Sequence, residues 1–166
     1  MEPLKMERKA ADNKYLHRDV DRTLDLGLSY IAEHYGEAAV KEYVRQITET
    51  YFSPLIGAIQ KDGLIALIDH INRTYEAEEA SDVCHTHISD GTLFVHIDAC
   101  PVLAYFRKTG HTVSPYYAET TKTFNKVLAE RTGLAYCLNF YDDETGECEY
   151  MFSEKQDFPA VSRNEG

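Results

Sequence analysis

Apolar side chains recur at spacings of three and four residues through the first half of the chain, which is the pattern of amphipathic helices. Gly36 and the Asp62-Gly63 pair interrupt this pattern, so three successive helices are expected. Pro54 falls inside the second helix, where its missing N–H is expected to kink or interrupt the helix. The three expected helices are 12–36, 37–62 and 64–76.

Residues 81–98 change to a period of two, which is typical of strands with one apolar face. The Asp90-Gly91 pair in the middle is the preferred sequence for a two-residue type I′ turn. With that turn at the tip, the register places Ile88 opposite Leu93 and Cys84 opposite Ile97, on the side facing the core. The opposite face of this hairpin is expected to carry Val83, His85, His87, Phe94, His96 and Asp98.

A second hairpin is predicted over residues 134–153, with its loop at residues 142–146. Its two strands put their apolar side chains on one face only if the loop has an odd number of residues, three or five. The side chains expected on that inner face are Tyr136, Leu138, Phe140, Cys148, Tyr150 and Phe152.

The stretch between the hairpins contains two helix start signals. Cys100 followed by Pro101 reads as an N-cap and first helical position, and Gly110 follows the expected end of that short helix. Ser114 followed by Pro115 repeats the signal for a second helix, which is expected to end near Gly133.

These elements predict an α+β fold, in which an antiparallel sheet built from two hairpins has helices packed against it. The length of 166 residues, with 43% apolar content, suits one ordinary core, so a single domain 1–166 is expected. Its ordered core is expected at about 12–153, between loose polar ends.

Charge and hydropathy narrow the classes of partner. The net charge of −11 and the pI near 5.0 disfavour nucleic acid and anionic membranes, because both are negatively charged. No apolar run approaches the roughly 18 residues of a membrane span, and no signal-peptide pattern is present at the start. We therefore expect a cytoplasmic protein whose partner is a small-molecule substrate or ligand. The sequence leaves open whether the chain forms a homo-oligomer.

The four cysteines lack a CxxC pair, so we interpret all of them as free thiols. Cys100 is the candidate nucleophile, because the N-terminus of a helix stabilises a thiolate. Its alternative role is that of a small buried apolar residue.

Glu119 and His111 complete the candidate catalytic set. Glu119, early in the second helix of the central stretch, could act as a general base, and its alternative role is a solvated helix position beside Lys122. His111 could shuttle protons near neutral pH, or it is an ordinary loop histidine.

The histidines of the first hairpin suggest a metal site. His85, His87 and His96 share one face of paired strands, and three imidazoles can hold a tetrahedral ion. A solvated sheet face explains the same pattern, so neither a metal nor another cofactor is expected.

Two segments carry a family resemblance: ACPVLAYFRKTGHTVSPYYAETTKTFNKVLAERTGLAY and FYDDETGECEYMF, with YFSPLI on an upstream helix. Together they resemble the L-2-amino-thiazoline-4-carboxylic acid hydrolase family, over about residues 15–152. The resemblance implies a hydrolase that opens a C–N bond of a small cyclic amidine or related heterocyclic acid. That family often has a cysteine before the ETT triplet, where this chain has Ala118.

The hydrolase hypothesis assigns catalysis to Cys100, Glu119 and His111. The helix N-termini are expected to receive a substrate carboxylate. The side chains expected to bind substrate are Ser114, Tyr117 and Thr121.

A second, fold-level likeness gives an alternative. A CP-helix followed by another helix and a cysteine-containing terminal hairpin is similar to 4-vinyl reductase-type domains, which implies a non-catalytic module that binds a small ligand.

Overall fold

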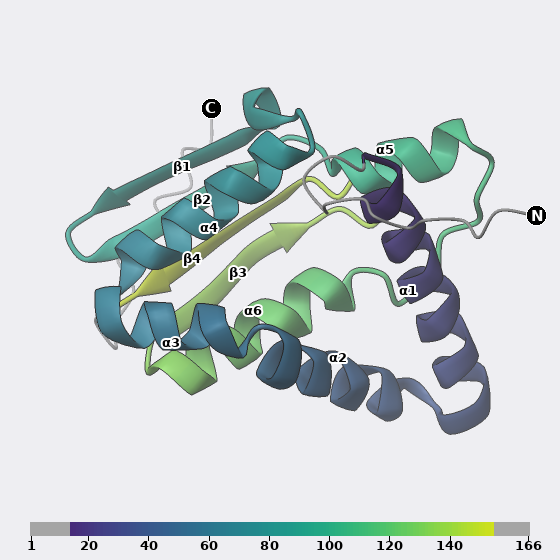
Figure 1. Cartoon of the computed structure of the whole chain (residues 1–166), viewed down its shortest axis with the longest axis horizontal. Helices are drawn as coiled ribbons and strands as arrows, with labels where there is room; N and C mark the ends of the chain where they lie inside the picture. Colours follow the sequence, from purple (N-terminus) through teal and green to yellow (C-terminus); the bar gives the residue numbers. More distant parts are fainter. Residues whose placement is uncertain (1–13, 155–166) are drawn as a thin grey trace, which may run out of the picture.

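The computed structural model describes residues 14–154 (Figure 1). The loose polar ends expected before residue 12 and after residue 153 lie almost entirely outside this range. The helices are α1 (Lys14–Tyr35), α2 (Glu37–Tyr51), α3 (Ser53–Asp62), α4 (Leu64–Ala77), the short 3₁₀ helix η2 (Ser81–Val83), α5 (Pro101–Lys108) and α6 (Glu119–Thr132). The strands are β1 (Cys84–Ser89), β2 (Thr92–Ile97), β3 (Ala135–Tyr141) and β4 (Cys148–Ser153).

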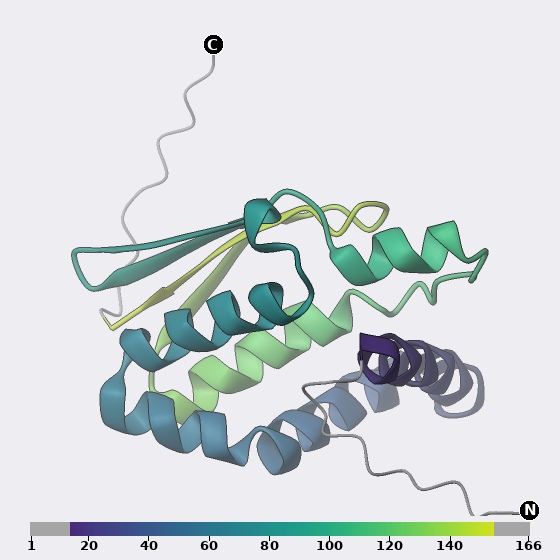
Figure 2. The ribbon, with the colours of Figure 1, turned by 45° about the horizontal axis from the view of Figure 1, so that its top comes forward.

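The strands form one antiparallel sheet in the order β1-β2-β4-β3, and this confirms the predicted α+β class. The α-helices all lie on one side of the sheet (Figure 2). Helices α4 and α6 pack directly on the sheet, while α2 and α3 lie beneath α6, farther from the strands. Helix α1 packs across α2 and reaches α5.

The first hairpin has the predicted register. Ile88 pairs with Leu93 and Cys84 with Ile97, and the turn residues Asp90 and Gly91 both have positive φ angles, of 50° and 72°. Positive φ at both positions is the requirement of a type I′ turn. Val95 is 1% exposed, so the expected face points into the core.

The second hairpin departs from the predicted alternation. Leu138 pairs with Tyr150 as expected, but a bulge then shifts the register so that Phe140 pairs with Glu149. The Phe140 ring therefore lies on the outer face, 39% exposed, and the prediction that it faces the core is wrong. The loop spans residues 142–147 and is therefore neither three nor five residues long. The bulge puts one extra residue into β3, which reverses the faces of the side chains that follow it.

Helix boundaries show two further differences. Pro54 ends the second predicted helix completely: α2 stops at Tyr51 and α3 begins at Ser53, with proline in its first turn. Helix α6 begins at Glu119, later than the Ser114-Pro115 signal. Residues 115–118 form tight turns instead, in which the Tyr117 N–H donates to the Ser114 carbonyl at 3.1 Å.

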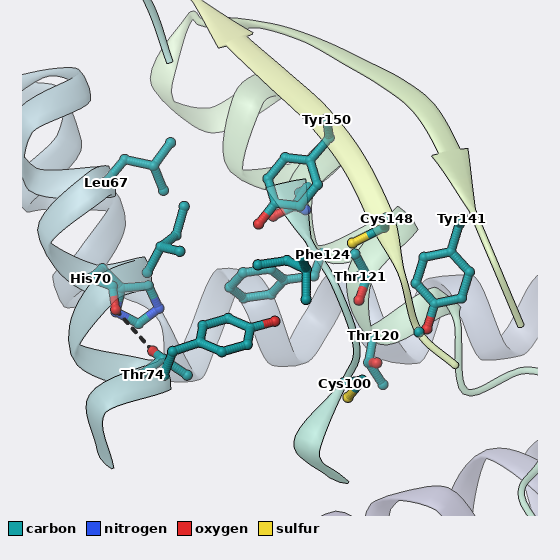
Figure 3. A pocket seen from close by; sticks show the side chains of 15 residues that line it. Leu67, His70, Thr74, Cys100, Thr120, Thr121, Phe124, Tyr141, Cys148 and Tyr150 are labelled. Atoms are coloured by element: carbon teal, nitrogen blue, oxygen red, sulfur yellow. Dashed lines mark hydrogen bonds between the residues drawn. The ribbon is translucent and has the colours of Figure 1, made fainter. Parts of the chain in front are cut away.

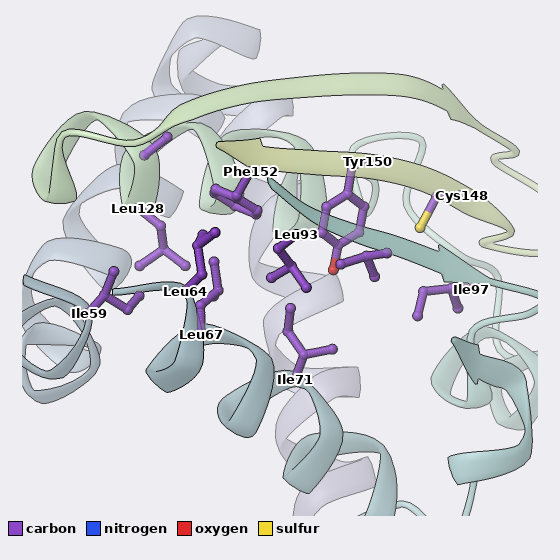
Figure 4. Close-up of a cluster of buried hydrophobic side chains, with 12 residues drawn as sticks. Ile59, Leu64, Leu67, Ile71, Leu93, Ile97, Leu128, Cys148, Tyr150 and Phe152 are labelled. Carbon is purple, nitrogen blue, oxygen red and sulfur yellow. The ribbon is translucent and has the colours of Figure 1, made fainter. Parts of the chain in front are cut away.

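The main core fills the space between the sheet and the helices (Figure 4). Strands β2 and β4 contribute every second side chain, while α3, α4 and α6 contribute one apolar stripe each. The buried members are Ile59, Leu64, Leu67, Ile71, Leu93, Val95, Ile97, Leu128, Ala129, Cys148, Tyr150 and Phe152.

A pair of substitutions in the first hairpin tests this packing. Leu93 is fully buried, whereas Ile88, its cross-strand partner, is 37% exposed. Leu93→Ala should lower the free energy of unfolding by about 2–5 kcal/mol through the lost burial and the cavity left behind. Ile88→Ala should cost less than about 1 kcal/mol. Urea unfolding of the two variants measures the difference, and equal losses would contradict the difference in burial between the centre of the sheet at Leu93 and its edge at Ile88.

Candidate functional site

A cavity of about 180 Å³ lies between α4, α6 and the inner face of β4, and the loop before β4 closes one end (Figure 3). Helix α4 supplies one wall and the first two turns of α6 supply the opposite wall. The lining residues are Leu67, His70, Ile71, Thr74, Tyr75, Ile97, Cys100, Thr120, Thr121, Phe124, Asn125, Tyr141, Gly146, Cys148 and Tyr150.

The polar groups of this cavity are uncharged near neutral pH. Among residues 14–154, none of those that line it is Asp, Glu, Lys or Arg. Burial lowers the pKa of His70, which favours the neutral imidazole. Burial raises the pKa of Tyr75, Tyr141 and Tyr150, so their phenols stay protonated. It also raises the pKa of Cys148 to about 12. The site therefore offers hydrogen bonds without a fixed charge.

Cys100 lines the cavity from the N-cap of α5, as the sequence predicts. Its N–H donates to the Thr145 carbonyl at 2.9 Å, which ties the start of α5 to the loop before β4. Gly146 in that loop has a φ of 72°, and a Cβ there would collide with the Cys100 Cβ and lie 3.0 Å from Leu103 Cδ1. The close approach of the loop backbone therefore requires glycine at position 146.

The environment of the Cys100 thiol differs from the expected one. Burial raises its pKa, and the N–H groups of Leu103 and Val102 lower it only in part. The expectation that the helix terminus lowers the pKa below that of a free thiol is wrong, because desolvation of the thiolate exceeds the effect of two N–H groups.

Thr121, one of the expected substrate-binding residues, also lines the cavity. Its hydroxyl forms a hydrogen bond that lowers the pKa of Tyr141 in part, so the two side chains meet at one end of the cavity. The N–H groups of Thr120 and Thr121 donate to the carbonyls of Tyr117 and Ala118, both at 3.0 Å. At the expected start of this helix, the N–H groups of Tyr116 and Tyr117 donate to the Ser114 hydroxyl and carbonyl at 3.2 and 3.1 Å, so these turns occupy N–H groups that were expected to receive a substrate carboxylate.

Ser114 and Tyr117 lie beside a second, smaller cavity of about 120 Å³. Tyr141 lines both cavities, and Ala118 lines the smaller one. The Tyr117 ring is buried against Phe106, with ring centroids 5.6 Å apart. The two expected substrate-binding side chains are therefore next to the main cavity and do not line it.

His111 has a structural partner that sequence spacing did not reveal. Its Nε2 atom lies 2.7 Å from the Asp25 carboxylate in α1, and the two side chains are 11% and 1% exposed. The backbone N–H of Ser114 donates to the same carboxylate at 3.0 Å. This pair fastens the loop between α5 and α6 onto α1, and His111 lines neither cavity.

Glu119 is separate from Cys100. Its carboxylate accepts a hydrogen bond from the Thr123 hydroxyl on the same helix, and it lines neither cavity. The structure therefore does not bring the three expected catalytic residues into one pocket. Of these three residues, only Cys100 lines the main cavity.

The hairpin histidines lie on the outer face of the sheet. Asp98 lies between two of them, 2.9 Å from His85 Nε2 and 3.1 Å from His96 Nε2. Among residues 14–154, no group of three or more His, Cys, Asp or Glu side chains has the arrangement of a metal site.

No family model, curated protein or solved structure matches this chain. The resemblance to the hydrolase family stays a prediction. Within the described residues, no helix has both the length and the apolar character needed to cross a bilayer.

Several polar residues of the main cavity were not among the candidates predicted from the sequence, notably His70, Tyr75 and Asn125. A signal for Asn125 exists in the sequence. It lies four residues after Thr121 and three before Leu128, within the stripe of α6 that faces the core. A polar residue inside such a stripe indicates a buried polar contact.

The pH dependence of thiol labelling tests the environment of Cys100. Iodoacetamide reacts with the thiolate, and a raised pKa leaves less thiolate at pH 7. Cys100 should therefore react more slowly than N-acetylcysteine at pH 7, and its rate should still rise above pH 9. Mass spectrometry of tryptic peptides gives the rate at each pH. A rate that levels off below pH 8 would show an activated thiolate instead.

Proposed function

We propose that this protein binds a small, uncharged, single-ring molecule in the main cavity. The observation that carries the proposal is a cavity with neutral hydrogen-bonding groups, to which the described part of the chain contributes no charged side chain. Its volume of about 180 Å³ suits one ring with small substituents, since an apolar cavity of about 150 Å³ holds benzene. A ligand with a net charge would lose its hydration there without gaining an ion pair.

The arrangement of the lining supports a heterocycle over a pure hydrocarbon. Apolar side chains such as Leu67, Ile71 and Phe124 provide contact area, while phenols and threonine hydroxyls provide a few directional hydrogen bonds. The four cysteines have free thiols, which suits the reducing cytoplasm that the sequence predicts.

A matched pair of ring compounds tests this binding. The neutral lactam 2-pyrrolidinone should bind, and 2-pyrrolidinone-5-carboxylate should bind at least about tenfold more weakly, because 1.4 kcal/mol of unpaired desolvation already has that effect. NMR titration measures both dissociation constants.

Thr121→Phe should abolish the binding of 2-pyrrolidinone by filling the cavity. Ile65→Phe, at a position of α4 that is 66% exposed, is the control for an added ring and should bind normally. Tighter binding of the carboxylate, or shifts confined to residues outside the cavity, would contradict the proposal.

A second candidate function is hydrolysis of a cyclic amidine, and the position of Cys100 in the cavity supports it. The thiol could add across the C=N bond, with sulfur bonding to carbon and its proton passing to nitrogen. Breakage of the ring C–N bond would follow, and water would then release the product from sulfur. Because burial raises its pKa, the thiol is protonated at neutral pH and becomes the nucleophile only as its proton passes to the ring nitrogen.

Substitution of single cysteines tests the hydrolase. With 2-amino-2-thiazoline-4-carboxylic acid as substrate, ring opening adds one water, which mass spectrometry detects. Cys100→Ser should lower turnover at least about a hundredfold, as expected for loss of a nucleophile. Cys137→Ser, outside the cavity, should have no effect. Turnover by Cys100→Ser at the original rate would exclude this mechanism, and the absence of turnover in the unsubstituted protein would leave the binding function alone.

A further inference from the structure

Asn125 is an unusual residue for its place in α6. The side chain is 5% exposed, and the three residues that follow Lys126 on the helix, Val127, Leu128 and Ala129, are all buried and apolar. An amide at such a position is costly unless it finds hydrogen-bond partners, and leucine would be the better helix former. Packing alone therefore does not explain why an asparagine occupies this position.

The amide of Asn125 lies among the hydroxyls of two tyrosines of the sheet. Its proximity to their hydroxyls lowers, in part, the pKa that burial raises for Tyr136 and for Tyr150. These two rings pack together with centroids 6.2 Å apart. Tyr136 lies on β3 and Tyr150 on β4, so α6 and both strands of the second hairpin meet here.

This group is not saturated with hydrogen bonds. The buried Tyr136 hydroxyl has no well-aligned partner among residues 14–154, so its contact with the amide is weak. An asparagine side chain offers two donors and one acceptor, and each phenol can donate or accept. Asn125 and Tyr150 both line the main cavity, and the Tyr150 hydroxyl points inward from β4 (Figure 3). Tyr136 itself is outside the cavity lining, so the polar groups of this set that lie beside a ligand are the Asn125 amide and the Tyr150 hydroxyl.

We propose that Asn125 and the Tyr150 hydroxyl recognise an uncharged ring that has an N–H donor next to a carbonyl acceptor, as in a cyclic amide. This inference rests on the proposed binding function and specifies its ligand class. The amide of Asn125 can accept from the N–H and donate to the acceptor at the same time, because its oxygen and nitrogen are side by side. A ring that lacks the N–H leaves the amide oxygen unpaired in a buried place.

A comparison of two five-membered rings tests the recognition. The lactam 2-pyrrolidinone has the N–H and the carbonyl, while γ-butyrolactone keeps the carbonyl and replaces the N–H by oxygen. The unsubstituted protein should bind the lactam about fivefold to tenfold more tightly, the effect of one buried hydrogen bond. NMR titration measures both dissociation constants.

Substitutions assign that preference to the two residues. Asn125→Leu keeps the size and removes the polar atoms, so the ratio of the two dissociation constants should fall to about one. Tyr150→Phe removes the second partner without removing the ring and should reduce the ratio as well. Tyr43→Phe is the matched control, because Tyr43 is on α2, is 37% exposed and does not line the cavity. It should keep the ratio of the unsubstituted protein.

The outcomes separate this inference from the function on which it rests. If neither ring binds the unsubstituted protein, the binding function itself is wrong. If both rings bind and the ratio is unchanged in Asn125→Leu and in Tyr150→Phe, Asn125 serves only the two tyrosines, and the inference is overturned while binding stands. If Asn125→Leu fails to fold, Tyr150→Phe decides alone.

Discussion

The pairing of β2 with β4 is the constraint on which the rest of this molecule depends. It joins the first hairpin to the last strand of the described chain, across the register from Thr92–Ser153 to Ile97–Cys148. After β2 the chain leaves the sheet, forms α5 and α6, and returns to the sheet through β3 before β4. Because β2 and β4 are both central, their inner faces are buried, and α4 and α6 cover them together.

The same pairing assembles the candidate site. At the Ile97–Cys148 end of the two strands, the chain leaving β2 reaches Cys100, and the loop entering β4 lies against it through the Thr145 carbonyl. One wall of the cavity therefore comes from sheet residues that are close only because of this strand pairing. The two other walls come from α4 and from α6. No single segment of the chain forms the site, because its lining residues come from several elements that the fold brings together.

The sequence predicted those parts of the fold that depend on residues close together in the chain, such as turns and helix starts. The Asp90-Gly91 turn fixed the register of the first hairpin, since a two-residue turn with positive φ admits one pairing. The Cys100-Pro101 start of α5 was predicted for the same reason. The start of α6 was not, because the residues after Ser114 satisfy the same N–H groups with tight turns.

The candidate site was predictable only in part. Cys100 and Thr121 were expected in the pocket and line it. The partner of His111 is Asp25, far away in the sequence, and no local pattern reports such a contact. Asn125 was detectable as a polar residue within a buried stripe, but the stripe alone does not show which strand side chains its amide meets.

The bulge in β3 has a consequence for the chemistry of the cavity. In a regular strand, alternation would have turned Phe140 inward and the next side chain outward. The register shift reverses this, so that Tyr141 pairs with Cys148 and its phenol forms a wall shared by both cavities. One additional residue in a strand has thereby replaced a hydrocarbon surface by a hydroxyl. The polarity of this interior, and with it the range of molecules it can hold, is set by backbone geometry as much as by the choice of side chains.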